Sequence, residues 1–473
     1  MKSKTSKCRW RKNVALLMLA TALSAYAQST PQSGPEVQAI LERLDRLEKD
    51  NQALLEEVRA LRQEVSGLRD SPALPSDTTA PSRNATPAQT AGERQAIEAN
   101  RIDELAQTKV EASQKFPIRV TGMALFNASL NGRLNGNAEN PLLASTIPAD
   151  MTGDGTLRQS TLGLLFNGPQ TLWNGKISGS VYVDFFGGST SSLDHLLRLR
   201  TAAIDIDWKN TSVMIGQDKP IISPRDPDSL AQVAYSPLAW AGNLWLWQPQ
   251  IRLEQRFSFT ENTGLRARAG AFVTSSLDYP SNPDFYIGPP SQQEYSRPGA
   301  EGRLELWHRW SGTGRIEIAG GYHFNQNRVI ETQVPSEVYS VDWFLRPFSK
   351  LEFSGMFFHG TNLGTLGGLP QGFVVRPECA EISVVHATGG WAQIRVPLTA
   401  RLAWDVYGGQ EDDRNADLIY GYVSKNQGYF SNLMYRIAPN VIVSLEGGQV
   451  RTAYLSMGTR LNDHYDLAIA YLF

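Results

Sequence analysis

Arginine is the residue type in this sequence whose placement most directly suggests chemistry. From residue 118 to the end, the chain carries 23 arginines and only five lysines, and several arginines recur two positions apart. A planar guanidinium group donates paired hydrogen bonds to carboxylate and phosphate groups, so a row of such side chains would guide anionic solutes. The residues expected to line this path are Arg198, Arg200, Arg252, Glu254, Arg256, Arg266 and Arg268.

The sequence offers the same arginines a second role. Carboxylates occur on the same stretches, so each guanidinium group would instead pair with a neighbouring acid and stiffen the structure that carries it. The acids available for such pairs are Asp205, Asp207, Glu254, Glu301, Glu305 and Glu317. Both roles stay open at the level of sequence.

The histidines and cysteines do not suggest an enzyme or a metal centre. The histidines outside the N-terminal region show no spacing typical of metal ligands. The two cysteines, Cys8 and Cys379, are too few for a disulfide framework or a Cys-rich metal site. We therefore expect no catalytic residue, no metal and no cofactor.

The elements that would position the arginines are β-strands. After Phe116 the apolar residues recur at every second position, as in a strand whose two faces differ. Apolar and charged side chains alternate in the run Ile251–Glu254, for example. Such a strand places its apolar face against lipid and its charged face in a wet lumen. Segments of this kind begin near Ile118, Leu157, Lys176, His195, Thr211, Gln250, Thr263, Gly299, Gly314, Glu337, Lys350, Gly389, Thr399, Gln427, Asn440 and Thr459.

Short turns and long connections alternate between these segments. Short turns such as Lys209-Asn210 are followed by long connections such as 219–249, 326–336 and 450–458. This alternation is typical of outer-membrane barrels, which place turns at the periplasmic rim and loops outside the cell. The sequence therefore predicts an all-β transmembrane barrel of about 16 antiparallel strands over residues 118–473, with both termini in the periplasm.

One predicted strand departs from strict alternation. Leu197 and Leu199 are out of phase with Ile204 and Ile206. This change of phase predicts a β-bulge near residues 201–203.

The third long connection, residues 219–249, combines charged with aromatic side chains. It resembles the third external loop of general porins of sixteen strands, which folds into the barrel and narrows it. The residues expected at such a constriction are Arg225, Asp226 and Asp228. An ordinary loop that projects outward is the alternative.

The N-terminal region predicts export. Its basic start, short apolar core and Ala25–Ala27 small-residue pattern are typical of a secretory signal peptide. The expected order is a signal peptide at 1–27, a mature N-terminal segment at 28–35, a periplasmic α-helical coiled coil at 36–69, a linker rich in Pro, Ser and Thr at 70–95, a short helix and lead-in at 96–117, and the barrel at 118–473.

The coiled coil predicts a homo-oligomer. Between residues 37 and 68 the apolar positions step alternately by three and four, which is a heptad pattern. Val at most a positions, Leu at most d positions and the single Asn51 at an a position favour two strands on composition alone.

Charge and hydropathy exclude two other classes. The formal net charge is −2 and the isoelectric point is about 6.4, which argues against a nucleic-acid-binding protein. Beyond the N-terminus, no apolar run approaches the roughly 18 residues that a membrane-spanning helix requires. A bundle of transmembrane helices is therefore excluded.

The C-terminus carries a further sign of a membrane barrel. Apolar and aromatic residues alternate from Tyr465 to the terminal Phe473. This ending resembles the C-terminal signature that the outer-membrane barrel assembly machinery recognises, so we expect that machinery to be a partner through Phe473.

Taken together, the signal peptide, coiled coil, linker and barrel resemble the DcaP-like outer-membrane porins. Local similarities are Val120–Gly122, Leu197–Arg200 followed by Thr201, and Ile215–Gln217. The resemblance covers the whole mature chain as architecture. It implies a trimer that takes up small organic anions, and we side with three subunits over the two that the coiled-coil composition favours.

The sequence thus predicts a Gram-negative outer-membrane porin. The water-filled channel would allow passive diffusion of small hydrophilic solutes, with a preference for small organic anions. The barrel would contact outer-membrane lipid, while the coiled coil would lie in the periplasm. The alternative is a structural or adhesive barrel that the coiled coil anchors toward the cell wall.

Overall fold

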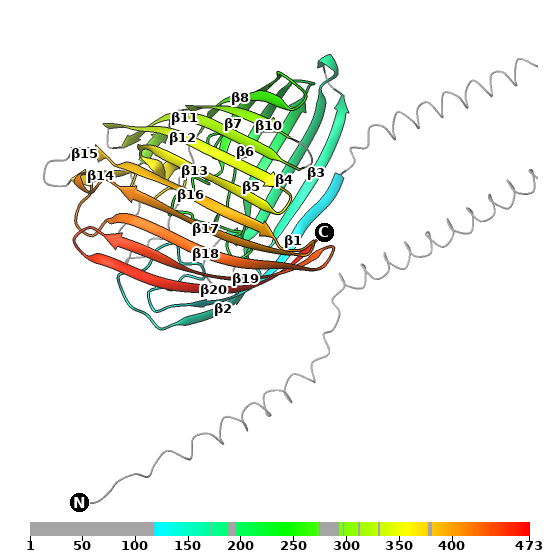
Figure 1. Cartoon of the computed structure of the whole chain (residues 1–473). Coiled ribbons are helices and arrows are strands. Elements are labelled where there is room, and N and C mark those ends of the chain that lie inside the picture. Colours follow the sequence, from blue (N-terminus) through cyan, green and yellow to red (C-terminus); the bar gives the residue numbers. More distant parts are fainter. Residues whose placement is uncertain are drawn as a thin grey trace, which may run out of the picture. The chain divides into compact units, whose positions relative to one another are not determined.

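Sixteen antiparallel strands close into a barrel within the part of the chain that the computed structural model describes (Figure 1). That part comprises residues 118–170, 172–187, 195–273, 293–296, 298–310, 313–329, 332–376 and 381–473. The predicted all-β barrel and its strand number are confirmed. The expected signal peptide, coiled coil, linker and short helix lie outside the described residues.

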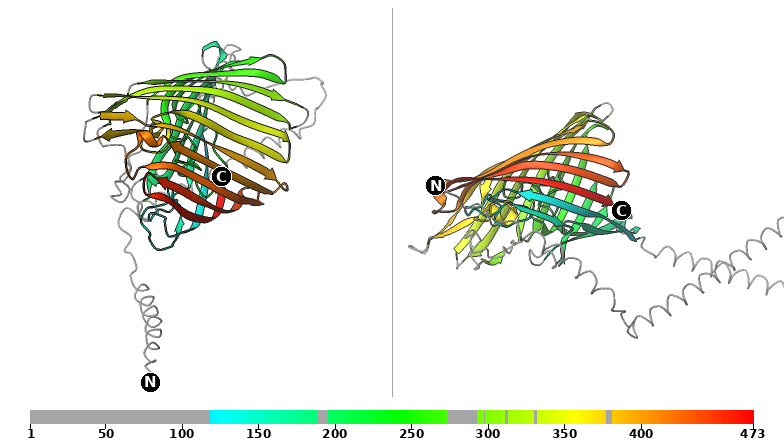
Figure 2. Two further views of the ribbon diagram at one scale, coloured as in Figure 1. Left: turned by 60° about the vertical axis from the view of Figure 1, so that its left-hand side comes forward. Right: turned by 90° about the horizontal axis from the view of Figure 1, so that it is seen from below.

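The wall strands follow one another around the barrel in chain order, each paired antiparallel with the next, and their tilt is visible from two further sides in Figure 2. They are β1 (Ile118–Asn131), β3 (Thr161–Gln170), β4 (Lys176–Gly187), β5 (Leu196–Asp207), β6 (Thr211–Asp218), β7 (Gln248–Ser258), β8 (Thr263–Phe272), β10 (Gly299–Arg309), β11 (Arg315–Val329), β12 (Thr332–Phe348), β13 (Leu351–Thr361), β16 (His386–Pro397), β17 (Leu402–Asp413), β18 (Val423–Ala438), β19 (Val441–Tyr454) and β20 (Gly458–Leu472).

The barrel closes between its first and last strands. β1 pairs with β20 from Met123↔Leu472 to Asn131↔His464, and its other edge pairs with β3. Closure gives every wall strand a paired neighbour on both sides, which is what a sheet in lipid requires. The shorter elements are β2 (Thr152–Thr156) paired with β1, β9 (Gln293–Ser296) paired with β11, the hairpin of β14 (Phe373–Arg376) and β15 (Glu381–Val384), and the 3₁₀ turns η1 (Leu172–Asn174), η2 (Leu363–Leu366) and η3 (Asn415–Asp417).

The two faces of the wall differ as the period of two predicts. On β20, Tyr465 and Ile469 point outward and are 57% and 42% exposed, while Asp466 and Ala468 point inward and are 4% and 0% exposed. Apolar side chains on the outer face suit a hydrocarbon environment, and polar groups are enclosed. No helix among the described residues is long and apolar enough to cross a membrane.

Within the described residues, short turns such as Lys209-Asn210 are confirmed, but the long connections expected at 326–336 and 450–458 are wrong. The β11–β12 and β19–β20 ladders continue until Val329 pairs with Thr332 and Tyr454 pairs with Gly458. Polar runs such as Asn325–Asn327 read as loop in the sequence, yet their backbone groups pair across the hairpin. Backbone hydrogen bonding does not depend on side-chain polarity, so the strands extend further than their hydrophobic pattern.

The predicted irregularity in β5 is confirmed within one residue of its expected place. Tyr182 pairs with Thr201 and Val183 pairs with Leu199, so Arg200 has no opposite residue on β4. This extra residue is a β-bulge, and it turns the side chains of Arg198 and Arg200 toward the same region of the interior.

Candidate functional site

The segment between β6 and β7, residues 219–247, lies inside the barrel, and we call it the inward loop. Its hydrogen bonds reach one wall strand after another, so residues 221–233 follow the inner circumference from β10 round to β5. The bonds join Ile221 to Glu301 of β10, Arg225 to Glu317 of β11 and Asp342 of β12, Asp228 to Gln393 of β16 and Asn432 of β18, Ser229 to Glu446 of β19, Leu230 to Asn127 of β1, and Val233 to Arg200 of β5.

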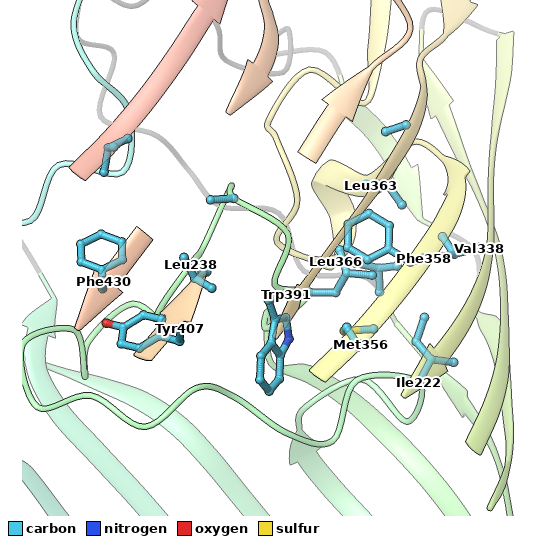
Figure 3. Packing of buried hydrophobic residues seen from close by; sticks show 14 residues of the cluster. Ile222, Leu238, Val338, Met356, Phe358, Leu363, Leu366, Trp391, Tyr407 and Phe430 are labelled. Atoms are coloured by element: carbon cyan, nitrogen blue, oxygen red, sulfur yellow. The ribbon is translucent and has the colours of Figure 1, made fainter. Parts of the chain in front are cut away.

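An apolar patch on the inner wall supports this loop. In Figure 3, Leu238 of the loop lies near Tyr407 and Phe430, and Ile222 lies near Met356. Each fully buried Leu or Ile side chain contributes about 1.5–3 kcal/mol, so this patch stabilises the inward position of the loop. The cluster contains Ile222, Leu238, Ala241 and Leu244 of the loop with Val338, Met356, Phe358, Leu363, Leu366, Ala387, Trp391, Tyr407, Phe430 and Val450.

Close backbone approach at Gly242 also fixes the loop. Gly242 has φ +103°, and a Cβ atom there would lie 2.2 Å from the carbonyl oxygen of Gly390 on β16. A side chain at this position would therefore both strain the backbone and collide with the wall.

Most of the predicted solute-path residues belong to one ion-pair network on the inner wall. Among the described residues it joins six arginines to five carboxylates. Its links are Asp207–Arg256 (3.8 Å), Arg256–Glu254 (3.7 Å), Glu254–Arg266 (3.7 Å), Glu254–Arg268 (2.6 Å), Arg266–Glu305 (2.9 Å), Glu305–Arg303 (2.7 Å), Arg303–Asp342 (2.8 Å), Asp342–Arg225 (2.6 Å), Arg225–Glu317, and Glu317–Arg315 (2.7 Å).

Three of the predicted path arginines in this network stay partly open to the lumen. The side chains of Arg256, Arg266 and Arg268 are 36%, 28% and 19% exposed, although each contacts a carboxylate. Wall pairing and contact with a passing solute are therefore compatible roles. Arg252 makes a separate pair with Asp218 at 3.1 Å and is 20% exposed.

The other two predicted path residues, Arg198 and Arg200, lie apart from this network. Both guanidinium groups contact the carboxylate of Asp184, at 2.6 and 3.2 Å. Both also donate to backbone carbonyl groups of the inward loop. Sequence reasoning missed Asp184 as their partner, because the contact depends on the register between β4 and β5 at the bulge.

The predicted constriction residues differ in their surroundings. Arg225 joins the network described above, and Asp226 contacts Lys219, Ser236 and Asn243 within the loop itself. Asp228 pairs with Arg395 of β16 at 2.9 Å, and 56% of its side chain is exposed. Asp228 therefore presents negative charge at β16 and β18, beyond the wall strands that carry the network.

Two further loops reach the inward loop, and sequence reasoning missed both. The η2 region is hydrogen-bonded to it through Leu246 N to Leu366 O, at 3.1 Å. The β1–β2 connection places Leu143 in a buried cluster with Trp240 of the loop and Leu369. Three segments far apart in the sequence therefore meet at the end of the barrel opposite to the short turns. Their buried leucines and tryptophans were the available signal, because such side chains are costly in exposed loops.

Glu139, at the end of the barrel opposite to the short turns, has a shifted pKa. Burial raises the pKa of Glu139 in the β1–β2 connection, and the Arg158 guanidinium, 3.3 Å away, opposes that effect.

A hollow of about 440 Å³ lies on the inner wall near the short-turn end. Its lining mixes polar and charged side chains with apolar ones, which suits a hydrated passage. The polar members are Arg119, Asn167, Ser178, Ser180 and Asp205.

The structure also brings together a Glu301–His323–Ser336 trio on β10, β11 and β12. His323 Nδ1 lies 2.8 Å from Glu301, and His323 Nε2 lies 3.2 Å from the Ser336 hydroxyl. A nucleophilic serine must meet its substrate, but Ser336 is 0% exposed and its hydroxyl donates to backbone carbonyl oxygens of residues 361 and 362. The trio therefore links the inward loop to the η2 region, since Glu301 also accepts from Ile221 N.

The described residues contain no group of three or more His, Cys, Asp and Glu side chains that could hold a metal ion.

A closed barrel of sixteen strands with an inward third loop has the architecture of outer-membrane channels. Among solved structures, the chain is similar to the outer membrane channel DcaP of Acinetobacter baumannii, with a TM-score of 0.60, 14% identity, and coverage of 76% of this chain and 97% of that one. It is also similar to an anion-selective porin from Comamonas acidovorans, with a TM-score of 0.51, 10% identity, and coverage of 76% and 100%. The expected likeness to DcaP is confirmed as a likeness of fold.

Neither a protein-family model nor a curated protein matches the sequence.

Proposed function

We propose that this protein is an outer-membrane porin of DcaP-like type, through which small hydrophilic solutes diffuse passively. The observation that carries the proposal is the closed barrel with ionisable side chains inside, apolar side chains outside, and a third loop anchored along the inner wall. Both solved structures named above are a channel or a porin, which supports the same function. In this proposal the protein lies in the outer membrane as a trimer, and its N-terminal coiled coil lies in the periplasm.

A preference for small anions is the finer part of this proposal. The ion-pair network contains one more arginine than carboxylates, and two arginines share Asp184. Low-dielectric walls strengthen the field of such local excess charge. Asp228 and Asp405 around Arg395 oppose it from another part of the wall, so the expected preference is small.

The test is ion conduction by the purified protein in planar bilayers. We expect stepwise channel conductance, and a reversal potential in a salt gradient that favours anions most strongly at low salt. The Debye length falls from about 30 Å at 0.01 M to about 3 Å at 1 M, so high salt screens the arginines. The Arg252→Ala, Arg256→Ala double variant should shift the reversal potential toward cations.

The matched control is Lys209→Ala, Lys350→Ala, which removes the same charge from the short-turn rim. A barrel that inserts but conducts no ions would exclude the porin and favour the structural or adhesive alternative. Cation selectivity of the wild type would exclude the anion preference but not the porin function.

A further inference from the structure

We propose that Gln159, Arg198 and Arg200 clamp the inward loop to the barrel wall, and that Asp184 holds the two arginines in the clamping position. This inference rests on the proposed channel function. It gives Arg198 and Arg200 a positioning role in place of the solute contact expected from the sequence.

Gln159 binds the backbone of the inward loop through three hydrogen bonds. Its side-chain oxygen accepts from Val233 N at 2.7 Å and from Ala234 N at 2.9 Å, and its amide donates to Ala231 O at 2.8 Å. Gln159 is 0% exposed, so these bonds face no competition from water. One side chain thus satisfies three backbone groups of a four-residue stretch.

The two arginines bind carbonyl oxygens of the same stretch. Arg200 donates to Val233 O at 2.8 Å, and Arg198 donates to Ala234 O at 2.6 Å. Together with Gln159, the wall makes five hydrogen bonds to the backbone of residues 231–234. Side chains therefore satisfy backbone groups that a strand partner would satisfy in regular structure.

Asp184 fixes the geometry of both arginines. Its carboxylate is 0% exposed and accepts from Arg198 Nε at 3.1 Å, from Arg198 Nη2 at 2.6 Å and from Arg200 Nη1 at 3.2 Å. The two-pronged contact with Arg198 orients its guanidinium plane, which is the property that distinguishes arginine from lysine.

Aromatic rings restrict the arginines further. The Arg198 guanidinium carbon lies 5.4 Å from the centre of the Phe186 ring, 5.7 Å from that of Tyr235 and 5.2 Å from that of Trp247. The Arg200 guanidinium lies 4.8 Å from the Trp247 ring. Tyr235 and Trp247 belong to the inward loop, so these contacts again join loop to wall.

The arginines of β7 and β8 have a different set of partners. The described ion pairs of Arg252, Arg256, Arg266 and Arg268 go to carboxylates on wall strands. None of their described hydrogen bonds reaches the backbone of the inward loop. These four side chains line the lumen without holding the loop, and they provide a matched comparison.

The first experiment compares two double variants in planar bilayers. Arg198→Ala, Arg200→Ala should give noisy open channels with frequent brief closures, because the released loop moves in the lumen. Arg252→Ala, Arg256→Ala should give quiet channels with a clear shift of reversal potential. A clamp variant with channels as quiet as those of its comparison would overturn the proposal.

A second variant tests the same role without changing an arginine. Asp184→Asn should reproduce the noise, and Asp218→Asn, which removes the partner of Arg252, should not. Retained heat-dependent mobility on gels shows that each barrel has folded. Quiet channels in Asp184→Asn would contradict the positioning role.

Thiol labelling measures the loop independently of conduction. In a Cys379→Ser background, Ala234→Cys should react slowly in the wild-type wall and about tenfold or more faster with Asp184→Asn or Gln159→Ala, because local opening controls access to buried groups. Equal rates would refute the clamp. This readout also separates the two proposals, since a barrel that conducts nothing fails as a porin yet still reports on its loop.

Discussion

The carboxylate of Glu254 contacts three arginines inside this barrel. It lies within 3.7 Å of Arg256 and Arg266 and within 2.6 Å of Arg268, so three guanidinium groups share one negative charge. Removing this carboxylate would therefore alter the charge that a solute meets at the wall.

Glu254→Gln should therefore increase the preference for anions. A unit charge about 8 Å from a permeating ion contributes about 0.5 kcal/mol even in water, which corresponds to roughly a twofold change in the permeability ratio. The measurement is the reversal potential at low salt. Glu261→Gln on the exposed β7–β8 turn is the control, and equal reversal potentials for the two variants would contradict this prediction.

At this scale the sequence pointed to several of the ion pairs, since Asp207, Glu254, Glu305 and Glu317 do pair with arginines, but it missed other partners. Residues 252, 256, 266 and 268 do face the interior, because a period of two fixes the face of a strand. The partners Asp184, Asp218 and Asp342 come from other strands or from a strand end, and their pairing depends on register. Register also depends on the geometry of the turns and on bulges, which the alternating pattern of these strands does not reveal.

Among the elements, the inward loop depends on close packing against the wall. Gly242→Ala should displace it, because the new Cβ would meet Gly390 O and the backbone conformation would be strained by about 1–3 kcal/mol. We expect altered single-channel conductance and faster proteolysis within residues 219–247. The control is Gly320→Ala on β11, where a Cβ atom would meet nothing within 4 Å. Unchanged conductance and proteolysis in Gly242→Ala would show that the wall tolerates the added atom.

The same loop shows why parts of the interior escaped sequence reasoning. The inner faces of β13 and β16 carry Met356, Phe358 and Trp391, where polar side chains were expected. They are apolar because they cover the loop and not a solute path. A strand with apolar residues on both faces does not show the alternating pattern. The loop residues that pack on its inner face lie more than a hundred positions away in the sequence, so no local pattern explains that face.

For the whole molecule, closure predicts resistance to detergent. The protein should migrate faster on unheated gels containing dodecyl sulfate than after boiling, because a closed barrel offers no free edge at which unfolding begins. Identical mobility before and after boiling would contradict a closed barrel.

The oligomeric state gives the second prediction at this scale. Mass measurement in detergent should give a trimer for the full chain, while a chain lacking residues 36–69 should still form a folded barrel. A dimer of the full chain would instead follow the coiled-coil composition. Loss of the folded barrel on deletion would show that the two parts depend on each other.

The seam between β1 and β20 has a consequence for how the chain acquires its structure. Thr121 Oγ1 donates to Phe473 O across 352 positions of sequence, and Gly122 N and Phe473 N each bond to the other residue's carbonyl oxygen. The edge of β1 that pairs with β20 therefore stays unpaired until the last residues of the chain have been synthesised and have reached the membrane. Folding with such a high contact order is slow, and an unpaired strand edge can pair with other chains during that time. A chaperone that shields β1 during this interval would therefore reduce pairing with other chains and raise the yield of folded protein.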